Sequence, residues 1–277
     1  MAIIDLHEAA QRLDRWFAEC PSAAVAFSGG VDSSLVAYWA RRCLGRGRSS
    51  AWTADSPSLK RIDLESAQAF CVDHDIAHRL LKTREIEDPD YALNPGDRCF
   101  HCKKTLYRRI HAELAESGNE VWVCSGANLD DRGDYRPGLL AAAEASVRHP
   151  LLECSIGKET VRALARHHGL KVWDKPASPC LSSRIPYGQA VTKEKLARIE
   201  AAENWMKEHG FPICRVRHDK ETARVEVPAD RLKALEKVWP LLIAAFGVLG
   251  FAAVELDEEG FVSGKLNREL GKAGAGV

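Results

Sequence analysis

Short apolar runs and segments with helical spacing alternate along the front part of the chain. The apolar runs fall near residues 23–28, 49–54, 78–83 and 120–124. Between them, near 34–44, 59–74 and 101–116, apolar residues recur with the spacing of one helix face. This alternation predicts an α/β fold, a parallel sheet with helices on both faces. Residues 84–98 contain prolines and a glycine and predict a polar loop.

The pattern changes after a stretch rich in helix-breaking residues, Lys175-Pro176-Ala177-Ser178-Pro179-Cys180. The elements expected after it are a helix from Thr192, strands near 213–218 and 223–227, a helix near 229–245 and a strand near 251–256. Both of the first two strands alternate apolar and charged residues, as half-buried strands do. We therefore expect an α/β domain over residues 1–175 and a smaller α+β domain over 176–277.

Composition and charge narrow the class of protein. Apolar residues make up 45% and charged residues 28% of the chain, as in globular proteins. Lys+Arg and Asp+Glu both number 39, a balance that disfavours a large basic surface for nucleic acid. No apolar run approaches the ~18 residues of a membrane span, and the N-terminal residues do not resemble a signal peptide. We expect a cytoplasmic protein that binds neither nucleic acid nor membrane.

One motif, Ser28-Gly29-Gly30-Val31-Asp32-Ser33, lies between a predicted strand and a predicted helix. Its glycines let the backbone approach a ligand, and the helix start offers unpaired N–H groups to phosphate. Asp32 can hold Mg²⁺ between phosphate oxygens. The Gly-Lys pairs of the chain, Gly157-Lys158 among them, lack the spacing of the common P-loop. The residues therefore predict a phosphate site, and the motif resembles the S-G-G-x-D-S loop of the ATP pyrophosphatases, which implies an ATP site; an ordinary glycine-rich turn is the alternative.

A second polar loop, Ser125-Gly126-Ala127-Asn128-Leu129-Asp130-Asp131, follows another predicted strand. Gly126 can approach the nucleotide, and Asn128 or one of the two aspartates can hydrogen-bond it or serve magnesium. A solvated turn is the alternative interpretation. We include Gly126 and Asn128 among the predicted nucleotide contacts.

The chain has nine cysteines, an odd number that disfavours a disulfide framework and favours metal or catalytic use. Cys99 and Cys102 form its one C-x-x-C, and Cys180 is the best third partner. Three cysteines without a fourth ligand suit a 4Fe–4S cluster with one open iron. A local structural or redox pair plus an unrelated loop cysteine is the alternative.

Arg215 and Arg217 alternate along a predicted strand and so point to one face. Two guanidinium groups on one face suit a phosphate or a dicarboxylate, whereas pairing with acids such as Glu226 is the alternative. Arg184, close to Cys180 in the sequence, completes the predicted substrate-binding residues.

Taken together, these motifs resemble the LarE-type ATP-dependent sulfur transferases, a branch of the PP-loop ATP pyrophosphatase superfamily. The matching segments are Ser28–Ser33, Ser125–Asp131, Gly133–Gly138, Pro179–Gly188, Arg215–Arg217, Ala223–Val227 and a pattern from Gly250 to Asn267. The resemblance covers nearly the full length, and the stretch that begins at Cys180, C-L-S-S-R-I-P-Y-G, is its most specific part.

The resemblance implies a two-step reaction in nickel-pincer nucleotide synthesis. ATP adenylates a carboxylate of pyridinium-3,5-biscarboxylic acid mononucleotide with release of pyrophosphate, and a sulfur nucleophile then displaces AMP. In one subtype a cysteine at the position of Cys180 is consumed and becomes dehydroalanine. In the other, three cysteines hold a 4Fe–4S cluster that carries an extra sulfide. The presence of Cys99 and Cys102 favours the cluster subtype, and the resemblance also suggests a homo-oligomer.

Three other functions agree with parts of the sequence. A PP-loop tRNA thiolase also uses a C-x-x-C and a third cysteine, but it needs a basic RNA-binding face. An ammonia-using ligase of the NAD or GMP synthetase kind needs none of the cysteines. A non-catalytic nucleotide-binding or iron–sulfur regulatory protein would not turn over ATP.

Overall fold

The computed structural model describes residues 5–116, 118–133, 136–262 and 265. The chain forms two compact units, the first within Met1–Glu85 and Cys99–Ser178, the second within Ile86–Arg98 and Pro179–Val277. The chain therefore contributes to the second unit twice, because Ile86–Arg98 interrupts the first. The functions expected for 1–175 and 176–277 remain predictions. Asp134, Tyr135, Leu266 and Asn267, which belong to the matching patterns, lie outside the described residues.

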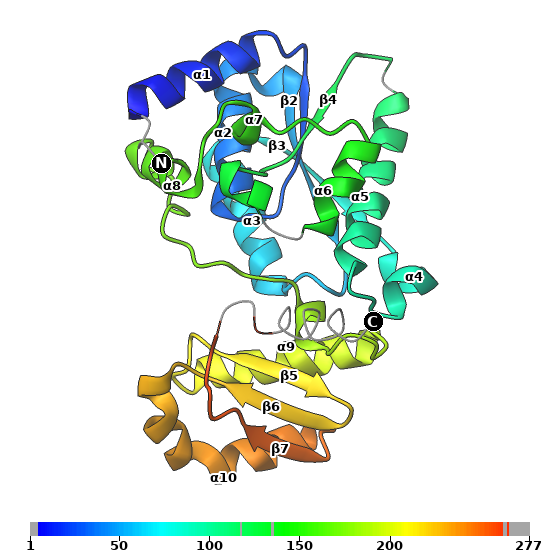
Figure 1. Cartoon of the computed structure of the whole chain (residues 1–277), viewed down its shortest axis with the longest axis vertical. Coiled ribbons are helices and arrows are strands. Elements are labelled where there is room, and N and C mark those ends of the chain that lie inside the picture. Colours follow the sequence, from blue (N-terminus) through cyan, green and yellow to red (C-terminus); the bar gives the residue numbers. More distant parts are fainter. Residues whose placement is uncertain (1–4, 117, 134–135, 263–264, 266–277) are drawn as a thin grey trace. The chain divides into compact units, whose positions relative to one another are not determined.

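A four-stranded parallel sheet forms the centre of the first unit, in the order β3-β2-β1-β4 (Figure 1). Its strands are β1 (Ala23–Ala26), β2 (Ser49–Asp55), β3 (Ala77–Lys82) and β4 (Trp122–Cys124). Val25 in the middle of β1 pairs with Ala51 of β2 and Cys124 of β4. The carboxyl ends of β1 and β4 consequently meet at one edge, where the two predicted nucleotide motifs begin.

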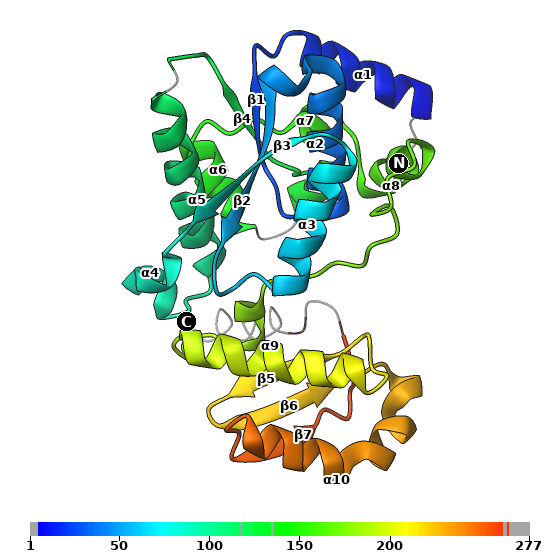
Figure 2. The ribbon, with the colours of Figure 1, turned by 180° about the vertical axis from the view of Figure 1, so that it is seen from behind.

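Helices cover both faces of this sheet, as the alternation of patterns predicts (Figures 1 and 2). The unit contains α1 (Leu6–Ala18), α2 (Val31–Leu44), α3 (Arg61–Asp73), α5 (Arg98–Ala115), α6 (Pro137–Glu144), α7 (Pro150–Glu153) and α8 (Lys158–His167). Val25 packs into one core with α1, α2, α3, α7 and α8, whereas Ala24 packs into another with α5 and α6. Successive strand residues thus bury opposite faces of the sheet, and the predicted α/β fold is confirmed.

The second unit has a three-stranded sheet in the order β5-β6-β7, in which β5 and β6 are antiparallel and β6 and β7 parallel. Its elements are α4 (Pro89–Ala92), α9 (Lys193–Glu208), β5 (Arg215–Asp219), β6 (Thr222–Glu226), α10 (Leu232–Val248) and β7 (Ala253–Leu256). Thr192 caps α9, since its Oγ accepts a hydrogen bond from the Lys195 N–H. Val216 and His218 face the core from β5, and Arg215 and Arg217 alternate with them. This small α+β unit was expected from the sequence.

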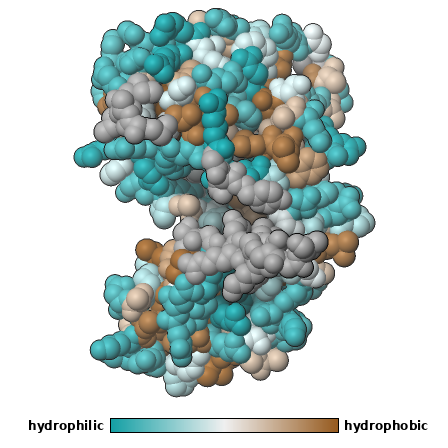
Figure 3. Space-filling model, in the orientation of Figure 1, coloured by the Kyte–Doolittle hydropathy of each residue, from teal (hydrophilic) through white to brown (hydrophobic). Residues whose placement is uncertain are grey.

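Surface properties agree with a globular chain. Hydrophilic side chains predominate on the face shown in Figure 3, and apolar ones occur there in scattered groups. Of the helices that the structure describes, none has both the length and the apolar character needed to cross a bilayer.

Candidate functional site

The Ser28–Ser33 motif forms a tight turn between β1 and α2. Gly29 has a φ of 69°, a left-handed conformation that favours glycine, and Gly30 caps α2. The Ser33 hydroxyl donates to the Gly30 carbonyl at 3.1 Å and accepts from the Ser28 N–H at 3.2 Å. The first turn of α2 therefore begins directly at the carboxyl end of β1, the arrangement that suits phosphate binding.

The loop after β4 lies against this turn. A Cβ atom built on Gly126 would lie 2.6 Å from the backbone nitrogen of Ser33 and 3.0 Å from the carbonyl carbon of Asp32. No side chain fits at that distance, so glycine at 126 permits the close approach. The structure thus brings together the two motifs that the sequence suggested separately.

The carboxylate of Asp32 contacts polar side chains from the loop after β4 and from the start of α8. Its Oδ1 accepts a hydrogen bond from the Asn128 amide at 3.1 Å, and its Oδ2 forms an ion pair with Lys158. Lys158 is the first residue of α8, and its backbone N–H donates to Asp130 at 2.6 Å. A carboxylate and an ammonium group therefore stand beside the start of α2, where a magnesium ion and phosphate oxygens can each find an opposite charge.

Lys175 reaches the same turn from the other side. Its Nζ donates to the Gly29 carbonyl at 3.2 Å and pairs with Asp63 at 3.1 Å, and the Ser178 hydroxyl donates to Asp63 at 2.7 Å. Burial disfavours the charged carboxylate of Asp63, but the contacts with Ser178 and Lys175 outweigh it and lower its pKa. Lys175 thus ties the glycine turn to α3.

Sequence reasoning missed both lysines. Lys158 was considered only as part of a Gly-Lys pair without P-loop spacing, and Lys175 only as the start of a stretch rich in helix breakers. A lysine that follows glycine at the start of a helical pattern, as in Gly157-Lys158, is a signal that could have identified the first. Lys175 carries no comparable local signal.

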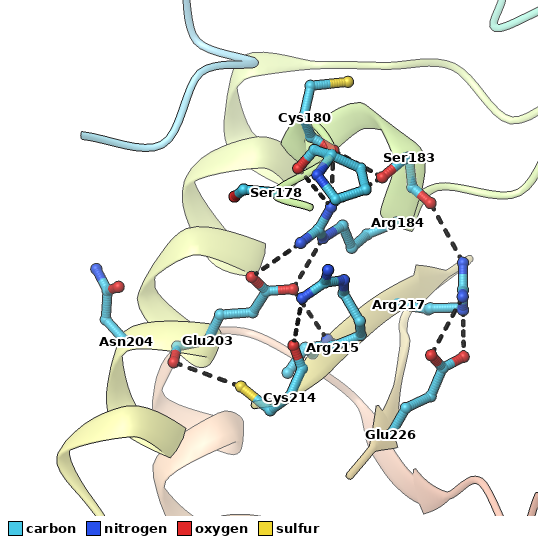
Figure 4. A network of polar contacts seen from close by, with 12 residues as sticks. Ser178, Cys180, Ser183, Arg184, Glu203, Asn204, Cys214, Arg215, Arg217 and Glu226 are labelled. Carbon is cyan, nitrogen blue, oxygen red and sulfur yellow. Dashed lines mark hydrogen bonds and ion pairs between the residues drawn. The ribbon is translucent and has the colours of Figure 1, made fainter. Parts of the chain in front are cut away.

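In the second unit, residues 179–188, here called the Cys180 loop, combine an exposed cysteine with a hydrogen-bonded backbone (Figure 4). The Cys180 carbonyl accepts hydrogen bonds from the Ser183 N–H at 3.1 Å, the Ser183 hydroxyl at 2.7 Å and Arg184 Nη1 at 2.9 Å. Arg184 Nη1 also donates to the Pro179 carbonyl at 2.8 Å. These bonds hold the main chain while leaving the sulfur accessible.

Arg184 is 1% exposed, and its guanidinium contacts protein groups on every side. Its Nε donates to Glu203 Oε1 at 2.8 Å and its Nη2 to Oε2 at 3.3 Å. Glu203, also 1% exposed, accepts the Val216 N–H of β5 as well. These contacts make Arg184 a link between the Cys180 loop, α9 and β5, while its assignment as a substrate ligand remains a prediction.

Arg215 and Arg217 have different surroundings on their common face of β5 (Figure 4). Arg217 forms an ion pair with the fully buried Glu226, the alternative considered from the sequence, and donates to the Ser183 carbonyl at 3.2 Å. Arg215 donates to the Cys214 carbonyl at 2.8 Å. Burial, followed by repulsion from Arg184, lowers the pKa of Arg215. Arg215 pairs with no carboxylate among the described residues, so its charge is the more available to an anion.

Cys99 and Cys102 lie near the start of α5, where residues three apart share one side of a helix. Cys99 is exposed and Cys102 half-buried. They belong to the first unit and Cys180 to the second, so a three-cysteine ligand set remains a prediction. Within the described parts of the chain, no three His, Cys, Asp or Glu side chains are grouped to hold a metal ion.

Burial makes several of the other cysteine thiols less reactive. Burial raises the pKa of Cys71 to about 12 and that of Cys20 and Cys154 to about 11. Thiols with such pKa values stay protonated at neutral pH and make poor nucleophiles or metal ligands.

Comparison with known proteins gives a consistent group of relatives, although no family model matches the chain. An uncharacterized protein of Synechocystis is 44% identical over 264 residues, 95% of this chain and 98% of that protein. The pyridinium-3,5-bisthiocarboxylic acid mononucleotide synthase of Lactiplantibacillus plantarum is 36% identical over 249 residues, 90% of each chain. The tRNA-specific 2-thiouridylase MnmA of Xanthobacter autotrophicus is 29% identical over 65% of this chain and 55% of its own length.

Proposed function

Because the chain belongs to the LarE-type family of sulfur transferases within the PP-loop superfamily, we propose that it makes a thiocarboxylate from pyridinium-3,5-biscarboxylic acid mononucleotide. It does so at the expense of ATP, in the synthesis of the nickel-pincer nucleotide. Besides the similarity to known proteins, one structural observation supports the proposal: the Asp32 carboxylate contacts both Asn128 and Lys158 at the start of α2. This is the charge pattern that a magnesium-bound triphosphate requires.

The first chemical step overcomes the poor electrophilicity of a carboxylate. A carboxylate oxygen of the substrate attacks the α-phosphorus of ATP, the bond to the bridging oxygen of the β-phosphate breaks, and pyrophosphate leaves. The backbone N–H groups of the glycine turn and the ammonium group of Lys158 stabilise the charge on that leaving group. The half-buried carboxylate of Asp32 fits a magnesium ion, which when bound supplies further charge stabilisation.

The second step transfers sulfur to the activated acyl carbon, with AMP as the leaving group. We propose Cys180 as the catalytic residue, because its thiol is exposed on a backbone that several hydrogen bonds hold in place. In the sacrificial subtype the Cys180 sulfur forms the new bond to the acyl carbon. A base then removes the Cα proton of this residue, the Cβ–S bond breaks as the Cα=Cβ double bond forms, and the sulfur leaves with the acyl group as the thiocarboxylate while the protein keeps dehydroalanine.

We further propose that Cys99 and Cys102 hold a 4Fe–4S cluster together with Cys180. Their position near the start of α5 fits such a role, since Cys99 is exposed and Cys102 half-buried on one side of the helix. When bound, a cluster with one iron that lacks a protein ligand supplies a place for an exchangeable sulfide. The protein's contribution is the three thiolates.

The mononucleotide phosphate is assigned to Arg215 and Arg217 in this proposal, as two guanidinium groups on one strand face suit an anion. The substrate is a small molecule, and a net charge of zero argues against a nucleic acid in its place. Action in the cytoplasm as a homo-oligomer completes the proposal.

Product analysis of the anaerobically purified protein tests this function. With ATP, Mg²⁺ and the pyridinium substrate, we expect release of pyrophosphate and a product that has exchanged oxygen for sulfur, measured by mass spectrometry. Asp32→Ala should abolish both, whereas Cys180→Ala should keep pyrophosphate release and lose the sulfur product. The matched variant Cys43→Ala should behave as the parent. Absence of pyrophosphate from the parent refutes the function, and sulfur transfer by Cys180→Ala refutes that cysteine's role.

A further inference from the structure

Residues 88–98, part of the stretch 84–98 that the sequence predicts to be a polar loop, pack into the second unit beside the Cys180 loop. It contains the short helix α4, which Asp88 caps by accepting the Asp90 N–H at 3.0 Å. Tyr91 on this helix is 1% exposed, and its hydroxyl hydrogen-bonds the Ser182 hydroxyl at 2.7 Å. The segment thus reaches the residue two positions after Cys180.

Asn94 holds the other end of the Cys180 loop. Its side-chain amide donates to the Ile185 carbonyl at 3.1 Å and the Pro186 carbonyl at 2.7 Å, and it is fully buried. Its own carbonyl accepts the Gly188 N–H at 3.0 Å. Asn94 has a φ of 57°, a left-handed conformation that asparagine tolerates better than most residues.

Arg98 completes this set of contacts. Its Nη1 donates to the Ser182 carbonyl at 3.0 Å and also bonds Asn94 Oδ1, and the side chain is 3% exposed. The guanidinium lies 5.8 Å from the ring of Tyr187. Arg98 therefore connects Asn94 of the segment with the Ser182 carbonyl of the Cys180 loop. In the sequence it directly precedes Cys99.

The Cys180 loop is consequently held from two flanks by buried donors. Arg184 binds the Pro179 and Cys180 carbonyls on one flank, while Asn94 and Arg98 bind the carbonyls that follow on the other. A buried carbonyl that loses its donor costs about 1–3 kcal/mol, so the loop has one strongly preferred conformation. The backbone that carries the exposed Cys180 thiol is therefore held in place by these hydrogen bonds.

Resting on the proposed function, we infer that residues 88–98 are a clamp that positions the Cys180 thiol for sulfur transfer, with Arg98 as its main positioning residue. A displacement of about 1 Å can slow a reaction a hundredfold, so loosening this loop should affect the sulfur step. The ATP site should not change, because Asp32 belongs to the other compact unit. Adenylation should therefore continue while Arg215 and Arg217, which the proposed function assigns to the substrate phosphate, keep their places on β5.

The test compares Arg98→Met with Arg109→Met. Arg109 also lies on α5, but its side chain is 52% exposed and pairs with Glu113 on the surface. For Arg98→Met we expect the kcat of sulfur transfer to fall at least about tenfold. The KM for the pyridinium substrate and the rate of pyrophosphate release should stay within about twofold. Water then hydrolyses the acyl adenylate, so that AMP and the starting carboxylate appear without a sulfur product. Arg109→Met should match the parent, and Arg98→Lys should recover part of the loss.

Equal losses of both steps, or unchanged sulfur transfer, overturn the inference. If Arg98→Met does not fold, Asn94→Gly replaces it with the same expectations, because glycine readily adopts the φ of this position.

Hydrogen exchange separates a failure of the clamp from a failure of the function. The Gly188 and Val191 amides donate to carbonyls of the clamp, Asn94 and Ala92 respectively. In Arg98→Met they should exchange at least about tenfold faster, whereas the amides of α10 should not change. If the parent forms no sulfur product, the proposed function fails. Faster exchange at Gly188 then still supports the clamp, and unchanged exchange overturns it.

Discussion

Gly126 and Ser33 approach so closely that a Cβ atom on the glycine would lie 2.6 Å from the Ser33 nitrogen and 2.9 Å from its Cα. Both are backbone atoms in the first turn of α2, which cannot rotate aside as a side chain can. A methyl group at 126 must therefore push the loop after β4 away from the helix start. The contact depends on the absence of a side chain at this position.

Gly126→Ala is accordingly expected to weaken ATP binding. Overpacking of this kind costs about 1–3 kcal/mol, which corresponds to a loss of roughly fivefold to 150-fold in affinity. Equilibrium dialysis with MgATP measures the change. Gly47→Ala is the matched control, because a Cβ atom there meets nothing within 4 Å. Parental affinity in Gly126→Ala would contradict the close approach of the two loops.

Lys158 provides a second prediction, because its ammonium group pairs with Asp32 in the structure. If it moves to phosphate oxygens when MgATP binds, Lys158→Met should slow pyrophosphate release by roughly 10- to 100-fold, the value of a hydrogen bond to a charged group. Lys171→Met is the control, since that side chain is 87% exposed and pairs with Asp73. If Lys158 only neutralises Asp32, its loss should leave the rate unchanged and tighten magnesium binding, the contrary result.

The sequence predicts the fold of the first unit because the patterns that indicate its strands and helices involve residues close together in the chain. Alternating residues of β1, such as Ala24 and Val25, face opposite cores. The spacing of apolar residues in α3 indicates its buried face, from Leu64 to Cys71. The strand–turn–helix context of Ser28–Ser33 is also local. Neighbours in the chain determine each of these features, so one sequence is enough to show them.

Contacts between distant segments were not open to prediction. Tyr91 meets Ser182 across 91 residues of sequence, and Asp32 meets Lys158 across 126. Such pairs arise from packing, and the residues around one partner do not identify the other. For the same reason the stretch 84–98, in which Tyr91, Asn94 and Arg98 are buried, is predicted to be a polar loop: its prolines and charges suggest exposure, while the partners of these three residues lie far along the chain.

The cysteines give a third prediction, which decides between the two subtypes. After anaerobic reconstitution we expect the parent to contain iron and sulfide, and Cys99→Ser and Cys102→Ser to lose the iron–sulfur absorbance, since each removes a thiolate ligand. Cys71→Ala, which alters a buried thiol, should keep it. A parent without iron whose Cys180 peptide loses the mass of hydrogen sulfide during turnover would instead show the sacrificial route.

Glu153 provides a prediction about pH. It pairs with Arg148 at 2.6 Å and accepts hydrogen bonds from His149 N–H at 2.7 Å and Trp16 Nε1 at 2.8 Å. Burial disfavours its charged form, but Arg148 and the other donors outweigh this and lower its pKa from 4.5 to about 2. A lowered pKa stabilises the fold above the unfolded-state value, and this stabilisation is lost as pH falls toward the folded-state value.

Glu153→Gln should therefore be less stable than the parent at pH 7, by roughly 1–2 kcal/mol after allowance for partial exposure. The difference in unfolding free energy should shrink as the pH falls from 4.5 to about 2. Urea unfolding at several pH values measures it. A difference that stays constant across this range would rule out the linkage.

Arg217 and Arg215 share a strand face but should respond differently to removal. Glu226, the partner of Arg217, is fully buried, so Arg217→Met leaves a carboxylate without its guanidinium inside the second unit. Breaking such a pair costs about 3–5 kcal/mol, and the double variant Arg217→Met/Glu226→Gln should recover much of it. Arg215→Met breaks no such pair and should change the unfolding free energy by less than about 1.5 kcal/mol, the value of one ordinary hydrogen bond.

Binding should distinguish the same two variants. Arg215→Met should lower the affinity for the pyridinium mononucleotide by roughly 10- to 100-fold, because a charged hydrogen bond to phosphate is lost. Its free energy of unfolding should change little. Isothermal titration calorimetry measures the affinity, and urea unfolding of the same samples measures the free energy of unfolding. Nicotinamide riboside and its mononucleotide serve as matched probes, since they differ by the phosphate alone. If Arg215→Met weakens both probes equally, the guanidinium does not bind phosphate, and its hydrogen bond to the Cys214 carbonyl serves the fold instead.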